Sequence, residues 1–249
     1  MSGKIRFAIV GAGVISPFHA KAIAANDKAE LVAIADVVEE KARKLANDFS
    51  VKDVYTDYQE MLKRDDIDVI NVCTPSGLHA EVTIAAAEAG KHVFCEKPLD
   101  ITLEKMEKMI RTTRERGVKL GVVYQRRTLP AAIAARDAVR SGKLGKLVLG
   151  DAYLKYYRSQ EYYNSAGWRG TWELDGGGAL MNQGVHGIDL IQWMVGDVES
   201  VFAHAAPLVR DIPVEDTAVA VLKYKNGAFG VIQGTTSVYP GMESRFEIH

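Results

Sequence analysis

The first half of the chain alternates short apolar runs with amphipathic segments, and this alternation restricts the possible folds more than any other feature. The apolar runs predict strands at 4–13, 30–36, 68–75, 91–98 and 118–124. The segments between them predict helices at 16–26, 38–49, 79–90 and 102–117. Strands that alternate with helices form a parallel sheet with helices on both faces. We therefore expect an α/β, doubly wound Rossmann domain over residues 1–123.

The second half has a different pattern, in which strands follow one another after a helix at 131–142. Strand-like segments occupy 146–157, 199–206, 216–224, 228–237 and 244–249, and "KNG" at 225–227 is typical of a hairpin turn. We expect an α+β domain over 124–249 with an open, mostly antiparallel sheet. Because the chain stops inside a strand-like run, we expect an incomplete sheet. Its open edge favours a homo-oligomer formed through the C-terminal sheet.

A glycine-rich loop, "GAGVIS" at 11–16, follows the first strand and begins a helix. Gly11 permits a tight turn and Gly13 lets a pyrophosphate approach the backbone, while Ser16 replaces the usual third glycine. An acid, Asp36, ends the next strand 25 residues after Gly11. A carboxylate there binds ribose hydroxyls and repels a 2′-phosphate, which predicts NAD. The alternative is a glycine turn without a ligand. The candidate contacts of this region are Gly11, Gly13, Val14, Ile15 and Asp36.

A second candidate site is "CEKP" at 95–98, which ends another strand of the same sheet. Ligands bind at the carboxyl ends of parallel strands, so Lys97 is expected to face the crevice. Its ammonium group could hold a substrate oxygen or move a proton. The alternative is one more exposed lysine. The two cysteines, Cys73 and Cys95, form no metal-type cluster, so we expect buried free thiols and no metal.

The run "GGGALMNQGVHGIDL" at 176–190 carries polar residues within an apolar helical pattern. Asn182, His186 and Asp189 follow i, i+4, i+7 spacing and are expected on one helix face. Such a stripe is either a hydrogen-bonded network in the core or the wall of a site.

The preceding segment, 156–175, surrounds Arg158 and Arg169 with tyrosine and tryptophan, as suits a sugar ring or an anionic group on it. A loop packed on the sheet, partly at a subunit interface, is the alternative. Tyr156, Trp168 and Arg169 are therefore candidate substrate contacts.

Composition gives no sign of nucleic-acid or membrane partners. The net charge is −1, from 31 basic and 32 acidic residues, so no strong basic field is expected. No apolar run approaches the roughly 18 residues of a membrane span, and the N-terminus does not resemble a signal peptide. We therefore expect a cytoplasmic protein.

Five motifs occur in a fixed order along the chain: "GAGVIS", "CTPSGLHAE" at 73–81, "CEKPL" at 95–99, "YQRRTLP" at 124–130 and "GGGALMNQGVHGID" at 176–189. With these motifs in this order, the chain resembles the glucose–fructose oxidoreductase and inositol dehydrogenase (Gfo/Idh/MocA) family. The resemblance implies a Rossmann domain followed by an α+β domain. It also implies oxidation or reduction of sugars, inositols or nucleotide sugars with NAD(P).

The resemblance also implies residue roles. Lys97 matches a catalytic lysine and is also a candidate cofactor contact. His186 matches a histidine that hydrogen-bonds the reacting hydroxyl and helps to move its proton. Asn182 stands where many members have an aspartate; an amide is no base, but it can orient a hydroxyl. Glu96 matches an acid beside the nicotinamide ribose. A turn that lines the cofactor in the family is matched by Thr74, Pro75 and His79. The candidate substrate contacts are Arg127, Tyr156, Trp168, Arg169 and Asp189.

Together these features predict an NAD-dependent dehydrogenase or reductase for a sugar-, inositol- or nucleotide-sugar-like alcohol or carbonyl. The alternative is a non-catalytic NAD-binding regulator or sensor of the same fold, which Lys97 and His186 argue against and Asn182 mildly favours. A pure oligomerisation module conflicts with the phosphate loop.

Overall fold

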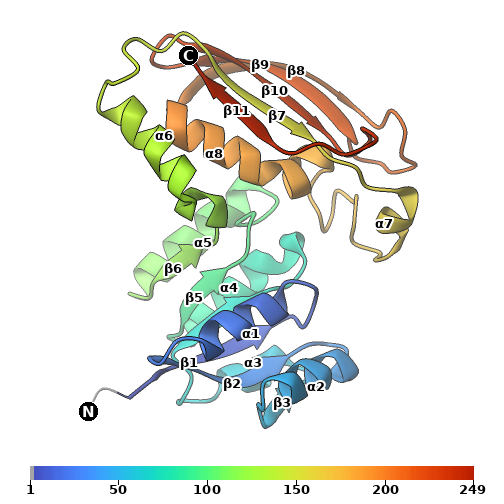
Figure 1. Ribbon diagram of the computed structural model, residues 1–249. Coiled ribbons are helices and arrows are strands. Elements are labelled where there is room, and N and C mark those ends of the chain that lie inside the picture. The colour runs from blue at the N-terminus through green and yellow to red at the C-terminus, as the bar shows by residue number, and fades with distance from the viewer. Residues whose placement is uncertain (1–2) are drawn as a thin grey trace. The chain divides into compact units, whose positions relative to one another are not determined.

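The structure is a computed structural model that describes residues 3–249. It divides the chain into two compact units, one ending at Val123 and the other running from Tyr124 to His249 (Figure 1). No helix within 3–249 combines the length and the apolar character that crossing a bilayer requires.

The first unit is built on a six-stranded parallel sheet with the strand order β3-β2-β1-β4-β5-β6. The strands are β1 (Ile5–Val10), β2 (Ala29–Ala35), β3 (Asp53–Tyr55), β4 (Val69–Val72), β5 (His92–Cys95) and β6 (Leu120–Val122). The helices are α1 (Ser16–Ala24), α2 (Glu39–Asp48), α3 (Tyr58–Leu62), α4 (His79–Glu88) and α5 (Leu103–Glu115). Two separate apolar clusters pack helices on the sheet, one with α1 and α2 and the other with α3, α4 and α5. This confirms the predicted doubly wound fold.

The sequence did not predict β3 and α3, which are only 3 and 5 residues long. So short a strand and helix give too few residues for a period to be recognised. The other predicted strands and helices of this unit are present, each with bounds within three residues of the predicted ones.

Four strands of this sheet end side by side, and the loops that follow them begin at one edge. The amide of Gly11, after β1, donates to Ala35 O at 2.8 Å, and that of Cys73, after β4, donates to Val10 O at 2.8 Å. The amide of Glu96, after β5, donates to Val72 O at 3.0 Å. Parallel pairing therefore gathers the glycine loop, the loop after β4 and the Glu-Lys-Pro turn at the carboxyl edge of one sheet.

The second unit contains a five-stranded sheet with the strand order β11-β7-β10-β9-β8. Its strands are β7 (Gly150–Lys155), β8 (Val198–Ala206), β9 (Thr217–Tyr224), β10 (Phe229–Thr235) and β11 (Arg245–Ile248). The β7–β10 pair is parallel and the other pairs are antiparallel, as expected of a mostly antiparallel sheet. The predicted hairpin joins β9 to β10, where Gly227 has φ +90° and the amide of Tyr224 donates to Ala228 O at 2.9 Å.

Helices α6 (Pro130–Arg140) and α8 (Val185–Val195) pack on one face of this sheet through a shared apolar cluster. The opposite face, here called the outer face, carries exposed apolar side chains together with polar ones such as Lys223 and His204. Phe202 of β8 lies opposite Val221 of β9, and these side chains are 67% and 52% exposed. Val219 and Phe229, on the same face, are also exposed.

The polar helix predicted over 176–190 differs from a single α-helix. Residues Ala179–Gly184 form a π-helical turn, and regular α-helix begins only at Val185. The i, i+4 geometry assumed between Asn182 and His186 is therefore altered, because a π-turn contains more residues than an α-turn.

Glu215 holds the start of this turn. Its backbone oxygen accepts from Ala179 N at 2.8 Å, and its carboxylate accepts from Gly178 N and Leu180 N, both at 2.9 Å. A Cβ at Gly178 would lie 1.8 Å from Glu215 O, so only glycine permits this approach.

Candidate active site

The glycine loop after β1 combines a tight turn at Gly11 with an open backbone at Gly13. Gly11 has φ +97°, and a Cβ there would lie 2.6 Å from Cys73 O, so a side chain is excluded. At Gly13 an added Cβ would meet no atom within 4 Å, and Val14 beside it is 79% exposed. The buried Ser16 donates from Oγ to Gly13 O at 2.7 Å. Serine at the third position of the motif therefore closes the loop with a hydrogen bond, and the backbone stays open at Gly13.

Asp36 stands directly after β2 and is fixed by backbone donors. Its Oδ2 accepts from Ala12 N at 2.6 Å, in the glycine loop, and its Oδ1 accepts from Val38 N at 2.8 Å. A carboxylate oxygen can accept more than one hydrogen bond. The half-buried group is thus joined to the loop and keeps acceptor capacity for ribose hydroxyls.

His79, the first residue of α4, bridges the two loops at this edge. Its Nδ1 lies 2.8 Å from Pro98 O and its Nε2 lies 2.9 Å from Thr74 O. Burial lowers its pKa, although both carbonyls and nearby carboxylates act in the opposite direction. A neutral ring carries one N–H and donates to one carbonyl at a time. The ring therefore joins the Thr74-Pro75 turn to the Glu-Lys-Pro turn.

A buried polar chain that sequence reasoning missed underlies the Glu-Lys-Pro turn. Glu96 Oε1 lies 2.8 Å from His19 Nε2, and His19 Nδ1 lies 2.9 Å from Asn71 Nδ2. The Nδ2 group of Asn71 can only donate, so His19 Nδ1 accepts and the ring proton is on Nε2, directed at Glu96. Burial acts to raise the pKa of Glu96, but His19 and the neighbouring backbone amide lower it overall. Glu96 is therefore an ionised, fixed carboxylate at neutral pH.

Lys97 follows in the same turn and is half-buried. Its backbone amide donates to Glu96 Oε2 at 3.2 Å, and the Lys97–Pro98 peptide is cis. The backbone that carries the ammonium group is thus held by the same carboxylate that His19 fixes.

In the second unit, the π-turn and α8 carry the candidate polar residues. Asn182 Nδ2 donates to Asp175 Oδ1 at 2.9 Å, and Asp175 Oδ2 accepts from Gly170 N at 2.9 Å. His186 lies in the first turn of α8 and is half-buried.

Asp189, one turn further along α8, does not join the Asn182 pair. Arg127 holds its carboxylate with both Nε, at 2.8 Å, and Nη2. The pairing raises the pKa of Arg127. The guanidinium also lies 5.7 Å from the Trp193 ring, whose face Arg136 covers at 4.1 Å. Two residues predicted to contact substrate thus bind each other within the second unit.

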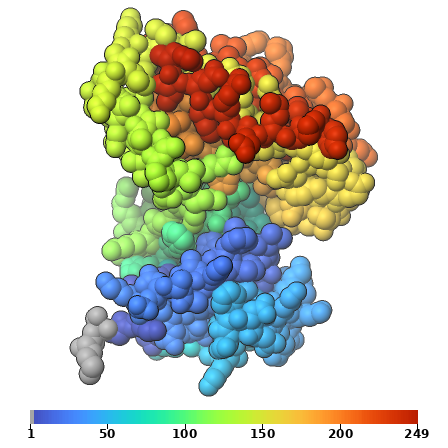
Figure 2. Space-filling model, viewed as in Figure 1, coloured from blue at the N-terminus to red at the C-terminus, as the bar shows by residue number. Residues whose placement is uncertain are grey.

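The segment from 156 to 175, drawn in yellow, forms a lobe at the surface around α7 (Gln160–Asn164) (Figure 2). Arg169 stacks on Tyr162 at 4.2 Å and on Trp168 at 4.9 Å. Arg158 stacks on the same Tyr162 ring at 5.3 Å and donates to Gln183 Oε1 at 3.1 Å. Tyr156 takes no part in this stacking, and its hydroxyl lies 2.8 Å from Ser244 Oγ.

These two arginines lack acidic partners. Within residues 3–249, neither Arg158 nor Arg169 has a carboxylate oxygen within 4.0 Å. Arg169 Nε is buried and makes no hydrogen bond there. Two cations on one ring, without a counter-charge, form a place that suits an anion.

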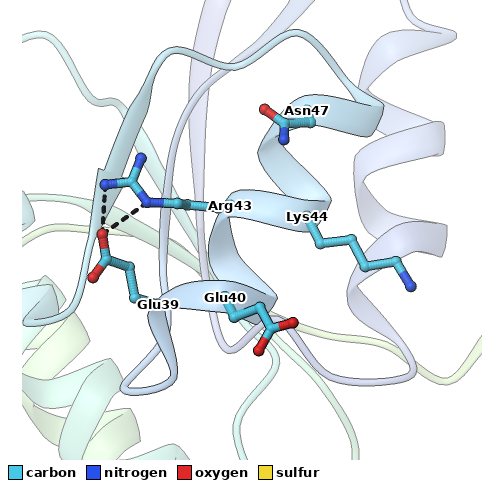
Figure 3. A pocket seen from close by; sticks show the side chains of 5 residues that line it. All are labelled: Glu39, Glu40, Arg43, Lys44 and Asn47. Carbon is cyan, nitrogen blue, oxygen red and sulfur yellow. Dashed lines mark hydrogen bonds and ion pairs between the residues drawn. The ribbon is translucent and has the colours of Figure 1, made fainter.

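A shallow hollow on the surface of α2 is a different kind of feature. Figure 3 shows that one helix supplies its charged walls, including Glu39 and Arg43, which form an ion pair. None of the predicted site residues lines it, and we assign it no role.

Both cysteines are buried free thiols, and burial raises the pKa of each.

The polar residues that sequence reasoning missed include His19, Asp175 and Glu215. Asp175 directly precedes the three glycines, so its position could have drawn attention. No periodicity or spacing points to the other two, because their partners are distant in sequence.

Comparison with known proteins identifies the family. Residues 5–124 match the model of the Gfo/Idh/MocA oxidoreductase family with its NAD-binding Rossmann fold, and residues 132–249 match the Gfo/Idh/MocA C-terminal domain. The chain belongs to this family and is an NAD-binding oxidoreductase.

Relatives include myo-inositol 2-dehydrogenase of Thermotoga maritima, 32% identical over 98% of this chain and 72% of that protein. D-glucoside 3-dehydrogenase of Escherichia coli is 36% identical over 91% of this chain and 68% of that protein. Among solved structures, the WlbA dehydrogenase of Bordetella pertussis in complex with NADH and UDP-GlcNAcA has a TM-score of 0.95 at 40% identity. That alignment covers 98% of this chain and 75% of that chain.

Proposed function

We propose that the protein is an NAD-dependent dehydrogenase of a sugar that carries an anionic group, such as a nucleotide sugar. The observation that carries this proposal is the pair of arginines, Arg158 and Arg169, stacked on Tyr162 with no acidic partner among the described residues. A guanidinium that is held by a ring keeps its donors directed and loses little entropy on binding a phosphate or carboxylate. The WlbA dehydrogenase, which is crystallised with UDP-GlcNAcA, supports an anionic substrate by likeness.

The cofactor is proposed to lie along the carboxyl edge of the first unit. Gly11, Gly13, Val14 and Ile15 would surround the pyrophosphate at the start of α1, whose amides suit an anion. The two oxygens of Asp36 would accept from the ribose hydroxyls. We assign Thr74, Pro75 and Glu96 to the nicotinamide end. His79 supports this end through the carbonyls that its ring contacts.

The chemistry proposed is removal of a proton and a hydride from one carbinol. NAD, when bound, would supply the hydride acceptor, and the protein's own residues take the hydroxyl proton. We assign that proton to Lys97 and His186, which share the general-base role, and we assign orientation of the hydroxyl to Asn182. Trp168 and Tyr156 are assigned to the sugar ring, and the Arg127–Asp189 pair is assigned to shaping the substrate wall.

The outer face of the second sheet is proposed to bind a second copy of this chain. Phe202, Val219, Val221 and Phe229 leave apolar surface uncovered there. Contiguous exposed apolar surface on a sheet is a common site of subunit association. A homo-oligomer formed through this face would cover it.

The proposed activity is tested by following the absorbance of reduced nicotinamide with a panel of nucleotide sugars, sugar acids, neutral sugars and inositols. We expect turnover with an anionic sugar. Arg169→Gln should raise the KM for this anionic sugar by about 10-fold to 100-fold, because a hydrogen bond between charged groups is lost. Arg140→Gln, at an exposed position of α6, is the matched control and should leave KM unchanged. Preference for neutral sugars, or an unchanged KM in Arg169→Gln, would contradict the anionic substrate.

Lys97→Ala tests the catalytic assignment separately. We expect kcat to fall by about 10²-fold or more, which is typical for loss of a general acid or base. NADH affinity should change little, because the glycine loop and Asp36 are intact. Turnover close to that of the wild type would show that Lys97 does not carry the proton and would favour a regulatory role for the fold.

A further inference from the structure

We propose that Asp175 is a positioning residue that sets the orientation of the Asn182 amide for the reaction. This inference rests on the proposed role of Asn182 in orienting the substrate hydroxyl. Its basis is the direct contact, in which Asn182 Nδ2 donates to Asp175 Oδ1 at 2.9 Å. No periodicity or motif led to this pair.

The chemistry of the two groups leaves one orientation for the amide. An ionised carboxylate accepts hydrogen bonds and cannot donate, so the NH₂ of Asn182 must face Asp175. The Oδ1 of Asn182 is then turned away from Asp175 and offers an acceptor to the other side. The reversed amide would place Oδ1 against the Asp175 carboxylate, acceptor against acceptor, which the carboxylate excludes. Asp175 therefore decides whether the site contains an acceptor or a donor at this point.

Asp175 is itself well fixed. It is 2% exposed, and its second oxygen accepts from Gly170 N at 2.9 Å. Its backbone amide donates to Thr171 O at 3.2 Å. Buried carboxylates are costly unless they are hydrogen-bonded. These bonds hold the carboxylate rigidly beside the half-buried Asn182. A residue that positions another side chain must itself be held in this way.

The same contact explains why an amide, and not a second acid, suits position 182. A carboxylate there would face the carboxylate of Asp175 across a hydrogen-bond distance. Two carboxylates so close cannot both be ionised, and one must keep a proton. Asn182→Asp should therefore disrupt the pair, although its side chain has almost the same shape.

The test is a charge exchange with three variants: Asp175→Asn, Asn182→Asp and the double variant Asp175→Asn/Asn182→Asp. Each single change removes the fixed orientation at position 182. In Asp175→Asn the oxygen of the new amide still accepts from Gly170 N, so its NH₂ faces Asn182, whose amide must reverse. In Asn182→Asp two acids meet and one must keep a proton. The double variant restores the match, because the new amide at 175 can donate to the new acid at 182. Asp197→Asn, at an exposed ion pair with Lys225, is the matched control. The readouts are kcat and KM on the substrate found above, NADH affinity and Tm.

We expect each single variant to lose about 10-fold or more in kcat with NADH affinity unchanged, and the double variant to recover most of that loss. Tm should show the same coupling. The inference is overturned if kcat of Asp175→Asn matches the wild type, even with a lowered Tm, since the role would then be structural. It is also overturned if the double variant shows the product of the two single losses.

Failure of the proposed function would look different. The wild type would then turn over nothing in the panel, while the Tm values, which need no substrate, still report the pair. Additive Tm changes in that case overturn the inference, and a recovered Tm in the double variant upholds the fixed amide.

Discussion

Glu215 lies in the loop before β9, where a substitution would ordinarily have a small effect on stability. Replacing Glu215 by glutamine should nevertheless destabilise the second unit clearly. The carboxylate accepts from Gly178 N and Leu180 N, one bond to each oxygen, both at 2.9 Å. Glutamine has a single acceptor oxygen, so its NH₂ must face one of these donors. One hydrogen bond to a charged group is thus lost, which costs about 1.5–3 kcal/mol.

For a chain of this size each kcal/mol lowers Tm by about 2–4 °C, so Glu215→Gln should lower Tm by roughly 3–12 °C. Turnover should fall as well, because Asn182 stands in the π-turn that these bonds begin. Differential scanning calorimetry gives the first quantity and steady-state kinetics the second.

The control is Glu199→Gln, the same chemical change in an ion pair with Lys223 whose two side chains are each about half exposed. Exposed pairs contribute about 0.2–1 kcal/mol, so this variant should behave almost as the wild type. If Glu215→Gln has the Tm and the turnover of Glu199→Gln, the carboxylate does not hold the turn and the reasoning is refuted.

Three further outcomes follow from the described contacts. The protein should bind NAD more tightly than NADP, because the carboxylate of Asp36 repels a 2′-phosphate; tighter NADP binding in a fluorescence titration would contradict this. The pKa of Glu96 is lowered by His19, so this carboxylate stabilises the fold above its unfolded pKa, and the benefit disappears as the pH falls through the folded value. Denaturant unfolding should accordingly show Glu96→Gln less stable than the wild type at neutral pH, with the difference shrinking as the pH falls below the ordinary carboxyl pKa of 4.5. A constant difference would oppose the assignment. Phe202→Asp on the outer face should reduce the mass measured by light scattering, whereas a wild-type monomer at micromolar concentration would rule out the proposed oligomer.

The fold could be predicted because a parallel strand covered on both faces appears in the sequence as a continuous apolar run. The runs that became β1, β2, β4 and β5 are of this kind, and they also place the glycine loop, Asp36 and Lys97 at strand ends. Short elements such as β3 leave no period to recognise.

The polar partners of the candidate site could not be predicted in the same way. Glu215 caps a turn 37 residues before it, and His19 contacts Glu96 across 77 residues. Hydrogen-bond partners so far apart depend on the tertiary fold and leave no local pattern. The π-turn was missed for a related reason, since the apolar periodicity across 182–190 is compatible with an ordinary α-helix.

The single parallel pair in the second sheet has a consequence for the order of folding. The β9–β10 hairpin closes over the short 225–227 turn, whereas β7 pairs with β10 by bringing Ala152 beside Ile232. Joining residues so distant requires closure of a long loop. The conformational entropy lost on closure opposes this step before any contact between the strands forms. We expect the hairpin to form early and β7 to enter the sheet late, together with β11, which pairs with β7. Substitutions in the hairpin should then change the folding rate, and substitutions in β7 should mainly change the unfolding rate.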